Sequence, residues 1–101
     1  MARNRQELEL VVDEMSRAVA DLMEQIISTG DMLADDQLKL ALLEDSSKPE
    51  YQDLRVYYVR RLVRNRRKLE DLRSTLDRQQ EQLESAKEKL RNAPAEALVA
   101  Q

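Results

Sequence analysis

The stretch that decides the fold is LVRNRRKLEDLRSTLDRQQEQLESAKEKL, residues 62–90. It carries a leucine at every seventh position and a second row of residues three positions after each leucine. Two rows at these steps give a narrow seam with an average period of 3.5 residues, which is typical of helices that wind into a left-handed coiled coil. The leucine row consists of Leu62, Leu69, Leu76, Leu83 and Leu90.

The row three positions after the leucines mixes apolar and polar residues. Leu72 and Ala86 extend the apolar seam, whereas Asn65 and Gln79 interrupt it. Two interpretations of Asn65 and Gln79 stay open. Each is a polar residue tolerated near a solvent edge, or a buried polar residue that fixes the register of helix pairing at some cost in stability. Neither interpretation implies catalysis.

A second heptad pattern runs through the first half of the chain. One row repeats every seven residues, and a shorter row runs beside it, four residues earlier in each heptad. Their combined width predicts a helix whose apolar stripe can face more than one neighbouring helix. The longer row is Val12, Val19, Ile26, Leu33 and Leu40, and the shorter row is Leu8, Met15 and Leu22.

Gly30 is the residue that could interrupt this first helix. A glycine costs roughly 1 kcal/mol relative to alanine in a helix interior, and Gly30 could cap one helix while Asp31 starts another. The row nevertheless keeps its phase from Ile26 to Leu33, whereas an interruption usually resets the phase. We therefore expect one helix, with a kink or a break at Gly30 as the alternative.

The two heptad patterns are separated by a short polar segment. Ser47 and Glu50 have the spacing of a capping box, and Pro49 suits the first turn of a helix because its missing N–H costs nothing there. Pro94 ends the second pattern. The expected organisation is one domain over 1–93, made of a helix over about 5–44, a turn over 45–47 and a helix over about 48–92, followed by a short C-terminal tail over 94–101.

Two helices of similar length joined by a short turn predict an all-α fold, a long antiparallel two-helix hairpin with coiled-coil packing. A hairpin has only one shared face, so apolar surface on both helices stays uncovered. Small cores also supply only a few kcal/mol. We therefore expect a second copy to close a four-helix bundle.

Composition argues against catalysis. The chain has no Cys and no His, which removes disulfides, thiolate nucleophiles, the commonest metal ligand and the usual general base. The carboxylates fall on expected solvent faces, and no phosphate-binding loop or nucleophile motif occurs. We therefore expect no enzyme, no cofactor, no metal and no small-molecule substrate. No apolar run follows Met1 to Gln6, so we also expect no signal peptide, no membrane contact and a cytoplasmic protein.

The second helix carries a run of bases with no acid between Arg55 and Lys68. One interpretation is a face for nucleic acid or for an acidic protein. The other is internal charge matching, since residues 1–46 carry a net charge of -7 and residues 47–101 a net charge of +4. Folding about the turn favours the second interpretation because it brings the acids Asp31, Asp35 and Asp36 near the bases. The candidate face consists of Arg60, Arg61, Arg64, Arg67 and Lys68.

Three tyrosines, Tyr51, Tyr57 and Tyr58, gather at the start of the second helix. We expect them to pack the end of the hairpin, and an aromatic binding patch is the alternative.

These patterns together predict a protein–protein interaction module, a small acidic helical-hairpin adaptor, chaperone or assembly factor that acts through coiled-coil contacts. Its expected partners are a second copy and a helical client protein. The alternative function is RNA or DNA binding through the basic face. The candidate interaction seam consists of Val12, Val19, Ile26, Leu33 and Leu40 in the first helix and Leu62, Leu69, Leu72, Leu76, Leu83 and Leu90 in the second.

Overall fold

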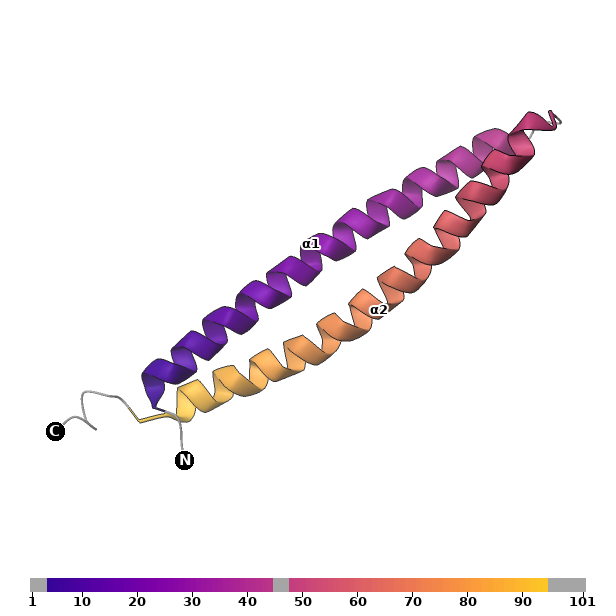
Figure 1. The fold of residues 1–101 in the computed structure, drawn as a ribbon. Helices are drawn as coiled ribbons and strands as arrows, with labels where there is room; N and C mark the ends of the chain where they lie inside the picture. The colour runs from indigo at the N-terminus through magenta and orange to yellow at the C-terminus, as the bar shows by residue number, and fades with distance from the viewer. Residues whose placement is uncertain (1–3, 45–47, 95–101) are drawn as a thin grey trace. The chain divides into compact units, whose positions relative to one another are not determined.

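The computed structural model describes residues 4–44 and 48–94 and contains two long α-helices, α1 (Arg5–Glu44) and α2 (Glu50–Asn92) (Figure 1). The two helices pack against each other as an antiparallel hairpin, so the predicted all-α hairpin fold is confirmed. The turn at 45–47, with Ser47 of the expected capping box, lies outside the described residues, as does the tail beyond Pro94.

Local interactions explain where each helix begins and ends. Asn4 caps α1, because its Oδ1 accepts a hydrogen bond of 2.8 Å from the backbone N–H of Glu7. At the start of α2, the backbone N–H of Tyr51 donates to the carbonyl of Lys48 at 3.1 Å, which closes a tight first turn. Pro94 follows the end of α2 and cannot continue it, because proline has no backbone N–H.

Helix α1 runs through Gly30 without a break, so the prediction of one continuous helix is confirmed. Gly30 does not adopt a positive φ, and a Cβ added to it would meet no atom within 4 Å. The apolar rows on either side of Gly30 explain the continuity, since burying them outweighs a glycine penalty of roughly 1 kcal/mol.

The chain divides into two compact units, each of which pairs one part of α1 with one part of α2 (Figure 1). We call Met1–Met23 with Thr75–Gln101 the terminal unit and Glu24–Ser74 the central unit. In the described part of the terminal unit, apolar side chains of both helices are buried between them. These buried residues are Leu8, Val19, Leu22, Leu83 and Ala86.

An arginine from one helix binds the C-terminal carbonyls of the other helix in each unit. In the terminal unit, Arg5 Nη1 donates to the carbonyls of Leu90 and Ala93 at 3.3 and 3.4 Å. In the central unit, Arg55 Nε donates to the carbonyl of Leu43 at 2.9 Å. Helix α1 has no basic residue in its own last turn, so Arg55 supplies the positive charge that favours the negative end of a helix dipole.

The burial pattern predicts which leucines hold the helices together. Leu83 is only 7% exposed, whereas Leu10 in the same unit is 60% exposed. Leu83→Ala should lower the free energy of unfolding by about 2–5 kcal/mol, because it removes buried methyl groups and leaves a cavity. Leu10→Ala should change it by less than about 0.5 kcal/mol. Urea denaturation followed by circular dichroism measures both, and equal losses in the two variants would contradict this packing.

Candidate interaction surfaces and a buried polar cluster

The two most buried side chains in the described part of the chain are polar. Asp36 is 0% exposed and Thr29 is 2% exposed, less than any of the buried leucines. Their position follows from the heptad pattern, because the row that begins at Leu8 continues in steps of seven through Thr29 and Asp36 to Leu43. The apolar residues of this row stop at Leu22, so the burial of Thr29 and Asp36 was not predicted. The spacing of seven residues, continued beyond Leu22, leads to both of these polar residues.

Asp36 has two partners on α2, one helical turn apart. Asn65 Nδ2 donates to Asp36 Oδ2 at 3.1 Å, and this hydrogen bond is buried. Arg61 Nε lies 3.0 Å from Asp36 Oδ1. The second contact is an ion pair without hydrogen-bond geometry, because neither atom has a partner at an acceptable angle. The carboxylate is thus held by one neutral donor and one cation.

Asn65 is 8% exposed, which matches the buried, register-fixing interpretation and not the solvent-edge interpretation. A buried carboxylate without donors is costly, so the pairing of α1 with α2 in the central unit must keep Asn65 level with Asp36. A slip of one heptad would put Leu72 or Tyr58 at that level, and neither can donate from the position of the Asn65 amide. The hydrogen bond therefore selects one register.

Gln79, the other polar residue of the leucine seam, lies in the terminal unit and is half-buried. Its Oε1 is buried and has no hydrogen-bond partner among the described residues. Gln79 therefore selects no register, and the structure gives no physical reason for its presence at this position.

The candidate seam residues lie between the helices of their own unit. Every one of them is buried or half-buried. Among the charged residues of α2, Arg67 and Arg78 are exposed, whereas Lys87 is half-buried. The seam therefore holds the hairpin together, and residues beside it are the ones available to other molecules.

A residue that directly precedes a seam residue lies on one flank of its helix, and a residue that directly follows lies on the other, because successive residues are about 100° apart. Lys39 and Arg61 precede the seam residues Leu40 and Leu62, and they belong to a flank that we call the charged side of the central unit. The members that contact one another or the facing helix are Asp35, Lys39, Tyr57 and Arg61.

Charges and aromatic rings link α1 to α2 on the charged side. Lys39 Nζ lies 2.9 Å from Asp35 Oδ2 and 5.4 Å from the centre of the Tyr58 ring. The hydrogen bond with Asp35 and the charge of Asp35 raise the pKa of Lys39 above its ordinary 10.5. The contribution of this group to stability is thus complete below pH 10.5 and is lost only as the pH rises through the higher folded-state value.

Arg61 is fixed in the same network. A side-chain hydrogen bond with Tyr57, followed by the charges of Asp36 and Asp35, raises the pKa of Arg61 above its ordinary value. The Tyr57 and Tyr58 rings meet edge to face, with centroids 5.1 Å apart. These tyrosines therefore belong to the packing of the central unit, although Tyr57 remains 51% exposed.

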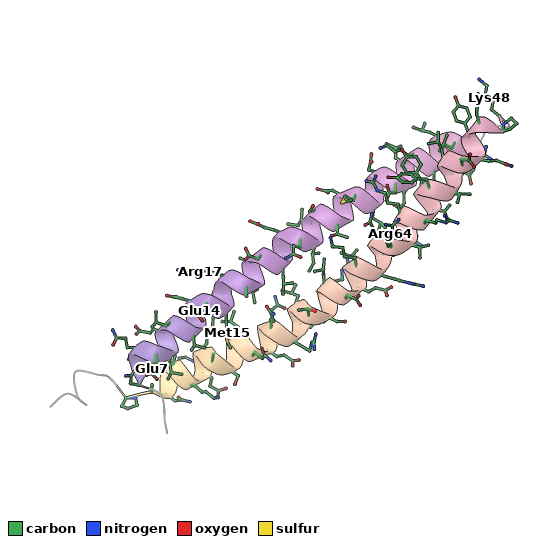
Figure 2. All side chains as sticks on the ribbon, viewed as in Figure 1. Glu7, Glu14, Met15, Arg17, Lys48 and Arg64 are labelled. Carbon is green, nitrogen blue, oxygen red and sulfur yellow. The ribbon has the colours of Figure 1, made fainter. Side chains whose placement is uncertain are left out.

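The basic face separates into two parts. Arg61 is half-buried and makes the expected ion pair with an acid of α1, namely Asp36. Asp35 pairs with Lys39 of its own helix and not with the basic stretch. The remaining bases of the candidate face are exposed, and Figure 2 labels one of them, Arg64, on α2. These exposed residues are Arg60, Arg64, Arg67 and Lys68.

The opposite flank of the central unit carries a second group of exposed apolar side chains among polar ones such as Gln37 and Arg66, and we call this group the apolar side. Ala41 and Val59 line one open groove there, together with Gln37, Glu44 and parts of the seam. Residues seven positions apart on α1, and residues three or four positions apart on α2, lie on the same flank of their helix, so further exposed side chains join Ala41 and Val59 there. The apolar side consists of Ile27, Ala34 and Ala41 on α1 and Val56, Val59 and Val63 on α2.

Exposed apolar side chains are unevenly distributed between the units. Of the eleven large apolar residues exposed in the described part of the chain, nine lie in the central unit and two, Leu10 and Met23, in the terminal unit. Contiguous exposed apolar surface commonly marks an interaction site. The nine are Ile27, Met32, Leu38, Leu42, Leu54, Val56, Tyr57, Val59 and Val63.

The described residues contain no group of three metal-ligating side chains, and neither described helix has a window long and apolar enough to cross a membrane. In comparisons with family models, with curated proteins and with solved structures, nothing matches this chain. Its function therefore has to be argued from the surfaces described above.

The buried pair predicts a specific pattern of stability. Asn65→Ala should lower the free energy of unfolding by about 1–3 kcal/mol, because the buried Asp36 carboxylate loses its donor. The double variant Asp36→Leu/Asn65→Leu should recover most of this loss, since both polar groups are replaced by apolar ones. Chemical denaturation of the three proteins measures this. A double variant less stable than Asn65→Ala would show that the pair does more than satisfy its own burial.

Proposed function

We propose that this chain is a non-enzymatic protein–protein interaction module, a small helical-hairpin adaptor, chaperone or assembly factor that binds a helical client protein in the cytoplasm. The observation that carries the proposal is the concentration of exposed large apolar side chains in the central unit. Water-exposed leucine, isoleucine and valine side chains gain free energy when a partner covers them, at about 25 cal/mol for each Å².

The spacing of these side chains suits a helical client. On α1, Leu38 and Leu42 stand four residues apart and are 60% and 72% exposed. On α2, Leu54 and Tyr57 stand three residues apart and are 42% and 51% exposed. Such i,i+3 and i,i+4 pairs form the ridges that fit between the side chains of another helix.

The charged side supplies fixed polar groups next to this apolar surface. Leu42 precedes Leu43, and Leu54 precedes Arg55, which stands seven residues before the seam residue Leu62. Both leucines therefore share that flank with Tyr57 and Arg61. Apolar anchors bordered by an arginine and a tyrosine have the composition of energetically important residues in protein interfaces. We therefore assign client binding to the charged side, with Leu42, Leu54 and Tyr57 as the anchors.

Site-specific photocrosslinking in cells tests this assignment. A benzoylphenylalanine at position 42 should form an adduct with a protein other than this chain, whereas the same residue at the exposed position 10 of the terminal unit should not. The protein in the adduct is then identified and purified. Leu42→Glu should weaken its binding about tenfold or more, since a charge replaces an apolar anchor.

Two results would contradict the proposed function. The first is an equal yield of adducts from positions 42 and 10. The second is a purified candidate client that binds the Leu42→Glu protein as tightly as the unmodified protein.

A second candidate function, nucleic-acid binding, is favoured by the exposure of Arg60, Arg64, Arg67 and Lys68. Phosphate contacts from such residues weaken steeply as salt rises. We expect the purified chain to leave a polyanion column below physiological salt. If it instead binds RNA or DNA at physiological salt, and Arg64→Glu/Arg67→Glu removes that binding without lowering stability, nucleic-acid binding replaces the client proposal.

A further inference from the structure

The client anchors lie on the charged side, so the exposed apolar residues of the apolar side are left without an assigned partner. Its α2 half is a row of three exposed valines, with Val56 at 47%, Val59 at 48% and Val63 at 43% exposure. Its α1 half is Ile27 followed by the small residues Ala34 and Ala41. Of these residues, Ala41 and Val59 line an open groove between the helices, together with the polar Gln37 and Glu44.

We propose that a second copy of this chain covers the apolar side, with α1 of each copy lying on α2 of the other. The two hairpins are related by a two-fold axis, and their central units together form a four-helix bundle in which neighbouring helices are antiparallel. This inference goes beyond the proposed function, because it names the partner of the apolar side, whereas the proposed client binds the charged side of the same unit.

The sizes of the side chains favour α1 on α2. Valines are stiff and branched, and they project as a ridge from α2. On α1, Ala34 and Ala41 leave room for such a ridge, as does Gly30, where an added Cβ would meet no atom within 4 Å. If α2 met α2 instead, valine would face valine and the two copies would be held further apart. If α1 met α1, the small residues would leave a gap between the copies.

The charges at the border of the apolar side favour the same arrangement. Asp31 stands four residues after Ile27 on α1, and Arg67 stands four residues after Val63 on α2, so each lies at the outer edge of its half. Both side chains are exposed. A second copy with α1 on α2 brings opposite charges together, whereas like helices on each other bring like charges together.

The register of the hairpin sets which charges meet. Asp36 of α1 is level with Arg61 and Asn65 of α2 in the central unit. Five residues earlier on α1, Asp31 is therefore level with the part of α2 near Arg67, because the helices are antiparallel. A two-fold axis parallel to the helices leaves each residue at the same height along the helices in both copies. Asp31 of one copy therefore lies beside Arg67 of the other, and this contact occurs twice in each dimer.

Sedimentation equilibrium of the purified full-length chain tests the proposal, free of the shape effects that disturb gel filtration. The unmodified protein should have twice the 11.8 kDa mass of the chain. Val59→Glu should sediment as a monomer, because a charge would be buried at the centre of the interface. The control is Leu42→Glu, an apolar-to-acid change at an exposed position on the charged side, which should leave the dimer intact.

Charge reversal gives a second test of self-association, with variants that alter only exposed residues. Asp31→Arg alone and Arg67→Asp alone should each weaken self-association by about three- to tenfold, since each places two like-charge contacts in the dimer. The double variant Asp31→Arg/Arg67→Asp should recover the original affinity. An equimolar mixture of the two single variants should also form a tight mixed dimer. This test decides the question even if Val59→Glu fails to fold.

Several outcomes would overturn the inference: a monomeric unmodified protein at several hundred micromolar, a dimer that Leu42→Glu dissociates and Val59→Glu does not, or single reversals that the double variant fails to rescue. Failure of the proposed function would look different. In that case the chain would dimerise as described, while position 42 would give no adduct with another protein.

Discussion

The buried carboxylate of Asp36 is the constraint on which the central unit depends. It occupies a seam position with no exposed surface and is held by the amide of Asn65 at 3.1 Å and by the guanidinium of Arg61. A hydrophobic seam alone would tolerate several registers, because one leucine replaces another after seven residues. A buried carboxylate does not tolerate this, since it needs its donors at one level. The polar pair therefore sets which residues of α1 and α2 lie level with each other on the charged and apolar sides.

Much of the fold was predictable from the sequence because heptad spacing reports directly on helix faces. The leucine row from Leu62 to Leu90 and the phase kept across Gly30 give two continuous helices, as the structure has them. The burial of Asp36 was not predicted, because the row loses its apolar side chains after Leu22 although its step of seven continues through Asp36. The pairing of Arg61 with Asp36 was among the expected pairs, whereas the partner of Asp35 was not predicted, because pairs within one helix compete with pairs between helices.

The two flanks were not predicted, although membership of a flank follows from heptad position, since the character of each flank depends on which exposed residues of the two helices lie level with each other. In the sequence, Val56, Val59 and Val63 are scattered among arginines, and Ile27, Ala34 and Ala41 look like a widening of the seam. With the register fixed, they lie on one flank around an open groove, and Arg61 on the opposite flank becomes part of a network with Tyr57 and Asp35. A hairpin can thus keep one flank for self-association and the other for a different protein.

The most direct test of this account is nuclear magnetic resonance of the Asn65 side-chain amide. The account predicts two separate Nδ2 proton signals that exchange slowly with water and show nuclear Overhauser effects to the Asp36 β-protons. Asn92, which is exposed near the end of α2, is the internal control and should exchange fast. An Asn65 amide that exchanges as fast as that of Asn92, with no contact to Asp36, would contradict the account, because nothing else in the seam selects the register.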